Sequence, residues 1–196
     1  RRKLKEIHQE LKLSLIYVTH DQVEALTFAD QVVVMTQGEV VQIGSAQQLF
    51  EEPAHTFVGY FIGNPGMNLL PCTIADGCAQ INSASITLAP AAKAALGVIK
   101  PSDRVTLGIR PEFIEVLGRP DPDTQQINTL PAQLGRVRNM GTHMLAEFQL
   151  GTQTIAAKLH TPLMAGNDTS TGNNRTAWLR FPTQRTLYYV NDKRVA

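Results

Sequence analysis

One histidine of this sequence stands where a side chain can act on a bound ligand. His20 follows the apolar run at residues 14–18 and precedes a helix-like segment that begins at Gln22. α/β proteins bind ligands at such places, outside the carboxyl ends of their strands. An imidazole there can donate a hydrogen bond to a phosphate or orient a water near neutral pH, whereas a carboxylate would repel the anion. His20 is therefore the candidate catalytic residue, although Thr19 and Asp21 also fit a purely structural interpretation as helix-capping residues.

The first 63 residues carry the pattern of an α/β unit that would position His20. Residues 14–18 are rich in β-branched and aromatic side chains, which suits a buried strand of a parallel sheet. Asp21 with Glu24 resembles a capping box, so a helix is predicted from Gln22. The other predicted elements are a surface helix up to about Leu11, buried strands at 31–35 and 40–44, a helix from the cap Ser45 through Phe50, and a helix from Pro53 through Phe61.

The sequence changes character at residues 63–66, which read Gly-Asn-Pro-Gly. We predict a domain boundary there, because turn residues gather and the helical periodicity is lost downstream. Short apolar runs separated by Gly, Pro, Asn and Asp then predict a small β barrel or sandwich. The predicted strands lie at 68–74, 84–88, 104–109, 133–139, 144–150, 154–159, 176–181 and 186–190, with a helical turn at 89–96 and a surface loop at 118–129.

The residues around His20 carry a family resemblance. Residues 16–26, IYVTHDQVEAL, resemble the switch-histidine segment of ABC transporter ATPases, in the form typical of maltose-type sugar and glycerol-phosphate importers. The resemblance continues through residues 29–35, 38–44 and 53–63. It implies that His20 reaches the γ-phosphate of ATP held between two subunits. His20 would thus be both the catalytic and the cofactor-binding residue of the parent enzyme.

A second resemblance lies in the β-rich half. Residues 107–112, LGIRPE, resemble a motif of the OB-like (TOBE) regulatory domain at the C-terminus of the same transporter ATPases, and residues 135–142 and 181–185 fit more loosely. The implied architecture is the α/β tail of an ABC ATPase domain at 1–63 and an all-β OB-like barrel or sandwich at 64–196. Arg110 precedes a proline and therefore ends an extended run, where we expect it to pair with Glu112 across a turn.

The family resemblance also implies cofactors and partners. The parent protein would use ATP and Mg²⁺, yet no G-x-x-x-x-G-K-[ST] phosphate loop occurs in the sequence. We expect that loop upstream of Arg1 in a longer protein, and we expect this segment alone to hydrolyse no ATP and to hold no cofactor. The implied partners are membrane permease subunits, an external solute-binding protein acting indirectly, and a second copy bound through the regulatory domain. The implied location is cytoplasmic, on the inner face of the cell membrane, and the implied solute is a sugar or a glycerol phosphate.

Two other functions stay open for the β-rich half. One is binding of a small oxyanion, as related domains of molybdate systems do, for which residues 169–172 offer Ser and Thr groups. The other is an OB-type nucleic-acid binder. A net charge of +1 and 6% aromatic residues argue against a basic, aromatic-rich groove, so we expect no nucleic-acid partner.

Other composition signals are mostly negative. The remaining histidines and the two cysteines, Cys72 and Cys78, have no ligand spacing, so no metal site is predicted. The start is not a signal peptide, and no run of about 18 apolar residues predicts a membrane span. Without parallel neighbours, the strands at 14–18 and 31–35 would expose their edges, and we expect this region to be rearranged, disordered or shielded by dimerisation.

Overall fold

The computed structural model describes residues 3, 10, 14–82, 84–118, 127–160 and 175–196. The predicted helix up to Leu11 falls almost entirely outside this part of the chain, as do most of the predicted loop at 118–129 and the whole of residues 169–172. In chain order the elements are α2 (Gln22–Phe28), β1 (Val32–Thr36), β2 (Glu39–Gly44), α3 (Ala46–Glu51), α4 (Thr56–Phe61), β3 (Asn68–Ala75), β4 (Cys78–Ile81), β5 (Ala84–Thr87), α5 (Pro90–Leu96), β6 (Val105–Ile109), the 3-10 turn η1 (Pro111–Phe113), β7 (Glu115–Leu117), β8 (Thr129–Asn139), β9 (Met144–Leu150), β10 (Gln153–Leu159), β11 (Arg175–Arg180), η2 (Thr183–Arg185), β12 (Leu187–Val190) and β13 (Lys193–Arg194).

The segment at 14–18 differs from its prediction. It forms no strand, and Ile16 and Val18 are each 90% exposed. A strand needs a neighbour to satisfy its backbone groups, and none of the described strands pairs with this segment. The predicted buried strand is therefore wrong for this chain.

The predicted strands at 31–35 and 40–44 exist but pair with each other. β1 and β2 form an antiparallel two-stranded sheet instead of joining a parallel one. Val34 is buried, while its neighbours Val33 and Met35 are exposed. One face of this hairpin therefore covers a small core and the other faces outward, which the prediction of fully buried strands did not anticipate.

The helix caps were largely predictable. Asp21 caps α2 by accepting from the Glu24 N–H, although the Asp21 N–H donates to Thr19 instead of to Glu24. Ser45 and Gln48 form a complete capping box at α3. The last helix of this region, α4, begins at Thr56 instead of at Pro53.

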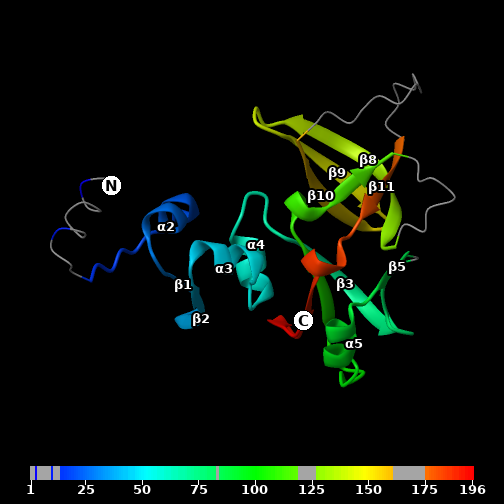
Figure 1. Ribbon diagram of the computed structural model, residues 1–196, viewed down its shortest axis with the longest axis horizontal. Helices are drawn as coiled ribbons and strands as arrows, with labels where there is room; N and C mark the ends of the chain where they lie inside the picture. The colour runs from blue at the N-terminus through cyan, green and yellow to red at the C-terminus, as the bar shows by residue number, and fades with distance from the viewer. Residues whose placement is uncertain (1–2, 4–9, 11–13, 83, 119–126, 161–174) are drawn as a thin grey trace.

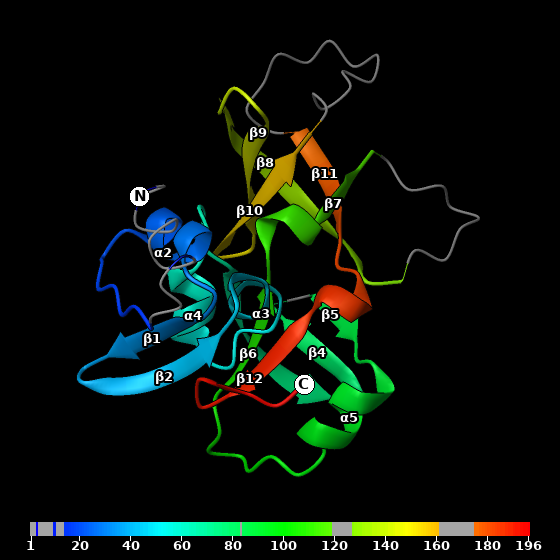
Figure 2. The ribbon, with the colours of Figure 1, turned by 60° about the vertical axis from the view of Figure 1, so that its left-hand side comes forward.

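Two antiparallel sheets make up the rest of the molecule. One has the strand order β13-β12-β6-β3-β4-β5 and the other the order β10-β9-β8-β11-β7. In Figure 2 the five-stranded sheet rises above the six-stranded one, and α5 lies beside β4 and β5. A single apolar core joins both sheets, with Leu107, Phe148 and Ile155 fully buried in it. This confirms the predicted β barrel or sandwich, in which the predictions missed only the short strands β4, β7 and β13.

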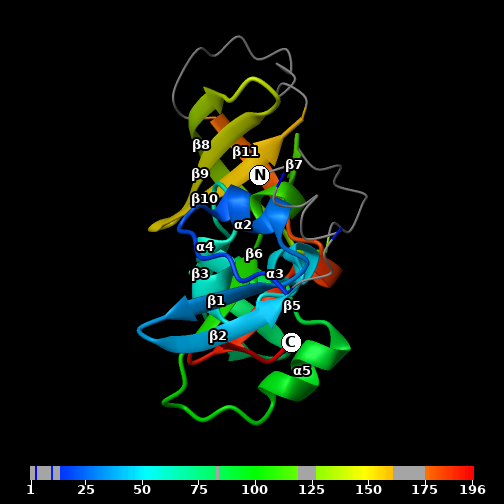
Figure 3. The same cartoon turned by 90° about the vertical axis from the view of Figure 1, so that its left-hand side faces the viewer.

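The hairpin β1–β2 and helix α2 lie at one end of the molecule and the two sheets at the other, with α3 and α4 between them (Figure 1). Viewed from the N-terminal end, α2 and the hairpin stand in front of α3 and α4 (Figure 3). A small second core fills this end, made of Val34, Leu49, Val58 and Ile62. The segment that contains His20 is therefore linked to the sheets through α3 and α4.

Candidate functional site

His20 lies at the entrance to α2, as the sequence predicts. Its side chain is exposed and makes no hydrogen bond or ion pair with any described residue. The residues on either side are held in place, because the Thr19 hydroxyl donates to Glu24 Oε2 at 2.8 Å and Asp21 accepts from the Glu24 N–H at 3.0 Å. The helix-capping role of Thr19 and Asp21 is thus real, and it leaves the imidazole of His20 open to a ligand.

Helix α2 is held in place by the small core. None of its residues is fully buried, but Leu26 packs against the cluster of Val34, Leu49, Val58 and Ile62. Because α2 contributes so little apolar surface, its position depends on that of α3 and α4. The placement of His20 therefore depends on what holds these two helices.

Arg110 holds them from the other side. The side chain extends from the end of β6 and is only 1% exposed, the largest of the fully buried side chains among the described residues. Its Nε donates to the Phe50 carbonyl at 2.8 Å, Nη1 donates to the Gly59 carbonyl at 3.0 Å and to the Ile62 carbonyl, and Nη2 reaches the Leu49 carbonyl at 3.4 Å. These four acceptors belong to the last turns of α3 and α4 and to the residue after α4.

The charge of Arg110 is stabilised by these acceptors. Carbonyls in the last turn of a helix have no intrahelical partner and carry the negative end of the helix dipole, so a guanidinium suits them. The ring of Phe50 adds a cation–π contact, with the guanidinium carbon 4.1 Å from its centroid. Burial lowers the pKa of Arg110 to about 10, and the nearby charge of Glu112 opposes this, so the side chain is charged at neutral pH.

The predicted ion pair between Arg110 and Glu112 is wrong. Glu112 binds Lys158 of β10 instead, with Nζ and Oε1 3.0 Å apart. Arg110 turns toward α3 and α4, because the helix carbonyls there offer its guanidinium four acceptors in a buried site. The sequence does not indicate these partners, because they are backbone carbonyls, which every residue type carries.

Aromatic and cationic side chains extend the same junction. Phe50 meets Phe113 of η1 edge-on, with ring centroids 6.3 Å apart. The guanidinium carbon of Arg185, in η2, lies over the Phe113 ring, 4.4 Å from its centroid. Arg185 also approaches Glu51, at 4.0 Å. The C-terminal end of α3 is therefore in contact with three separate parts of the sheet region.

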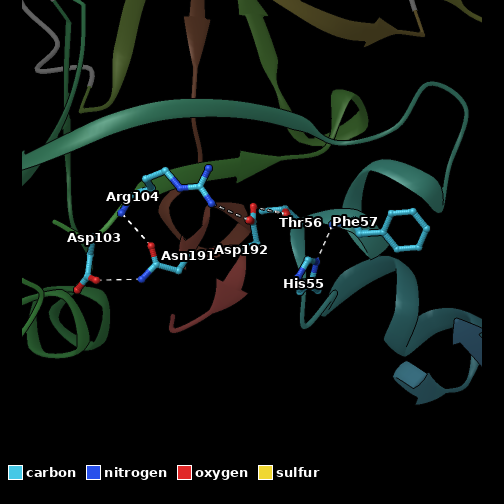
Figure 4. Close-up of polar contacts among 7 residues, drawn as sticks. All are labelled: His55, Thr56, Phe57, Asp103, Arg104, Asn191 and Asp192. Carbon is cyan, nitrogen blue, oxygen red and sulfur yellow. Dashed lines mark hydrogen bonds and ion pairs between the residues drawn. The ribbon is translucent and has the colours of Figure 1, made fainter. Parts of the chain in front are cut away.

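A polar network joins the start of α4 to the β12–β13 turn (Figure 4). The Thr56 hydroxyl donates to Asp192 Oδ1 at 2.7 Å, and the Thr56 N–H donates to the Asp192 carbonyl at 2.9 Å. His55 caps α4 by accepting from the Phe57 N–H through Nδ1. His55 therefore has a structural role, in line with the absence of a ligand spacing around it.

No metal or membrane signal accompanies these contacts. Within the described ranges, no group of three or more His, Cys, Asp or Glu side chains could hold a metal ion. In the same part of the chain, no helix is long and apolar enough to cross a membrane. A single exposed imidazole, such as that of His20, does not by itself make a cradle for a triphosphate.

Comparisons with known proteins agree with the fold and the His20 segment. Residues 63–114 match the family model of the MalK OB fold domain. The chain is 36% identical over 190 residues to the sn-glycerol-3-phosphate import ATP-binding protein UgpC of Pectobacterium atrosepticum, covering 93% of this chain and 47% of that protein. It is 42% identical over 168 residues to the uncharacterized ABC transporter ATP-binding protein y4oS of Sinorhizobium fredii, covering 81% of this chain and 40% of that protein. This chain is the MalK-type OB domain region of an ABC transporter ATP-binding protein.

The chain corresponds to the C-terminal region of these ABC ATP-binding proteins. It spans about half the length of the curated relatives it matches, with 47% of the UgpC protein of Pectobacterium atrosepticum and 43% of that of Yersinia enterocolitica covered. Residues 63–114 of its two-sheet unit match the MalK OB fold domain, and we refer to the whole two-sheet unit as the OB-like domain. Among solved structures, the cytoplasmic molybdate-binding protein ModG aligns with a TM-score of 0.49 and 8% identity, covering 62% of this chain and 94% of ModG.

Proposed function

We propose that the chain is the regulatory C-terminal part of an ATP-binding subunit that couples ATP hydrolysis to solute uptake by an ABC importer. The observation that carries this proposal is the continuous likeness to import ATP-binding proteins, which runs through the His20 segment into the OB-like domain. The solute class that fits these relatives is sn-glycerol-3-phosphate or a sugar. ATP and Mg²⁺ would be bound by the complete subunit.

His20 would contact the γ-phosphate of ATP in that subunit. Its exposure and the separate anchoring of Thr19 and Asp21 support this, because the imidazole can turn toward a ligand without breaking the cap of α2. An imidazole can donate a hydrogen bond to a phosphate or orient the attacking water.

The partners follow from the same proposal. The complete subunit would bind the membrane permease subunits on the cytoplasmic face, form a homodimer through the OB-like domain, and meet the external solute-binding protein only indirectly. An electrophoretic-shift assay with single-stranded DNA, expected to be negative, checks the absence of a nucleic-acid partner.

The test replaces His20 in the polypeptide that joins this chain to its upstream reading frame. His20→Ala should lower kcat for ATP hydrolysis by about 10²-fold or more, the range of a lost positioned proton-transfer or water-orienting group. His143→Ala is the matched control, because the imidazole of His143 bonds to the Thr142 hydroxyl at the turn between β8 and β9, away from the His20 segment. An unchanged kcat in His20→Ala, or an upstream frame without a phosphate loop, would overturn the proposal.

A further inference from the structure

The junction between α3–α4 and the OB-like domain depends on one buried charge. Burying a guanidinium is costly unless its donors are satisfied, and every acceptor of Arg110 comes from residues 49–62. The donor thus belongs to β6 of the OB-like domain and all the acceptors belong to the helical segment. Separating the two parts would leave the charge without its acceptors and would take one hydrogen bond from each of the four carbonyls, of which that of Gly59 also accepts from the Met67 N–H.

Other contacts across this junction are weaker. The Arg185–Glu51 and Arg194–Glu52 pairs are 4.0 and 3.6 Å long, and their side chains are exposed or half-buried. Exposed ion pairs of this kind contribute little. Neutral hydrogen bonds also cross the junction. The Tyr189 hydroxyl donates to the Pro53 carbonyl at 3.1 Å, and Thr56 donates to Asp192 from both its hydroxyl and its N–H. Arg110 differs from these contacts because it is a buried charge that donates to four carbonyls of the helical segment.

The anchored helices lead directly to His20. Arg110 binds the carbonyls of Leu49 and Ile62, and the side chains of the same two residues form the small core with Val34 and Val58. Leu26 of α2 packs on that core. One continuous set of contacts thus runs from β6 to the helix that begins directly after the cap of the His20 loop.

We propose that Arg110 is a positioning residue that couples the OB-like domain to the His20 segment through α3 and α4. A shift of the OB-like domain would then be transmitted to α2 and would change where His20 lies. The role for His20 in hydrolysis rests on the proposed function above, whereas the mechanical coupling rests on contacts within this chain alone. Through these contacts, a movement of the regulatory domain would change the position of the residue that we propose to contact the phosphate.

Amide hydrogen exchange on this chain tests the coupling. Arg110→Lys keeps a charge but cannot serve four carbonyls, so we expect the amides of Glu52 and Ile62 in the anchored helices, and that of Ala29 at the end of α2, to exchange about tenfold faster. Phe50→Leu, which removes only the stacked ring, should act in the same direction with a smaller effect. Arg138→Lys is the control, because Arg138 pairs with Glu147 on the far sheet.

Protection of the Phe148 amide reports whether the OB-like domain stays folded in each variant. If the helices and α2 keep wild-type exchange in Arg110→Lys, the anchor is refuted. If α3 and α4 loosen while α2 does not, the anchor is only local, and the coupling to His20 is refuted as well.

Kinetics in the longer polypeptide distinguish coupling from general destabilisation. Arg110→Lys should lower kcat for ATP, and the double variant with His20→Ala should lose no more than His20→Ala alone, since both changes act through the same residue. Additive losses would contradict coupling. If the wild-type polypeptide hydrolyses no ATP, the proposed function fails, while the exchange result still decides the anchor.

Discussion

Asn68 is a buried amide that ties the two sheets of the OB-like domain together. Its Nδ2 donates to the carbonyls of Ile109 and Ala156, and its Oδ1 accepts from the Ala156 N–H at 2.8 Å. Asn82 and Asn128 make similar links, to Leu150 and to Thr87. Apolar packing fixes the spacing of two sheets, and these amides fix their register because each one bonds a specific backbone group.

Replacing Asn68 with alanine should therefore destabilise the domain markedly. The change removes three hydrogen bonds and leaves the N–H and carbonyl of the half-buried Ala156 without their Asn68 partner, which costs about 2–4 kcal/mol. Urea denaturation measures the difference in the free energy of unfolding. Gln133→Ala is the control, because Gln133 is exposed on β8, and we expect a change of about 0.5 kcal/mol or less. Equal effects of the two variants would show that the Asn68 bonds contribute little.

At the residue level, contacts between residues close in sequence were predicted correctly, and contacts between residues far apart in sequence were not. The caps Asp21 and Ser45 were predictable because a cap and its partner are close in sequence. His20 was found from its place between an apolar run and a helix. Arg110 was assigned the wrong partner, since its acceptors lie about fifty residues away and are backbone carbonyls. Residue types alone cannot indicate such a contact.

Among the elements, the β12–β13 turn is the one most directly tied to α4. Asn191 and Asp192 both have positive φ, at 49° and 71°, which is the backbone of a two-residue hairpin turn between Val190 and Lys193. Asp192 accepts from the Thr56 hydroxyl at 2.7 Å and from Arg104 at 3.4 Å (Figure 4). The turn thus sets its own geometry and binds the neighbouring helix.

Two substitutions of Asp192 separate these contributions. Asp192→Asn keeps an oxygen that accepts from Thr56, and asparagine tolerates a positive φ. The variant loses only the ion pair with Arg104, whose side chain is 80% exposed. We therefore expect the free energy of unfolding to fall by about 0.5 kcal/mol or less. Asp192→Ala loses both bonds and puts a strained residue in the turn, and it should cost about 1–2 kcal/mol. Urea denaturation checks the order, and a loss in Asp192→Asn as large as in Asp192→Ala would mean that the ion pair dominates.

The strands show where local sequence is sufficient. Runs such as residues 144–150 were predicted correctly because alternating apolar and polar residues indicate a half-buried antiparallel strand. The run at 14–18 has an equally strong β composition but forms no strand here, because β structure depends on a pairing partner that the run itself does not contain. The four residues of β4 gave too short a pattern to be recognised.

At the scale of the whole molecule, the distribution of apolar surface is uneven. The OB-like domain has one large apolar core and exposes single apolar residues such as Val98, whereas the hairpin β1–β2 exposes two cross-strand pairs, Val33 with Ile43 and Met35 with Val40, each residue at least half exposed. Ile16 and Val18 add to the exposed apolar surface of the same end of the chain. A surface of this kind favours association between copies.

We therefore expect this chain to self-associate reversibly through the β1–β2 face. Val33→Thr with Ile43→Thr keeps β-branched side chains in both strands but replaces one apolar branch of each by a hydroxyl, so the double variant should associate only at higher concentration with unchanged stability. Sedimentation velocity over a concentration series measures the association, and urea denaturation measures the stability.

Val34→Thr supplies the matched control, because it makes the same chemical change one residue away, where the side chain is 5% exposed in the small core. It should leave association in place and cost about 1–3 kcal/mol in the stability of that core, since a hydroxyl is buried there. A wild-type chain that stays monomeric throughout the series would contradict the expectation. Association that persists in the Val33 and Ile43 double variant would assign it to another surface, such as the OB-like domain.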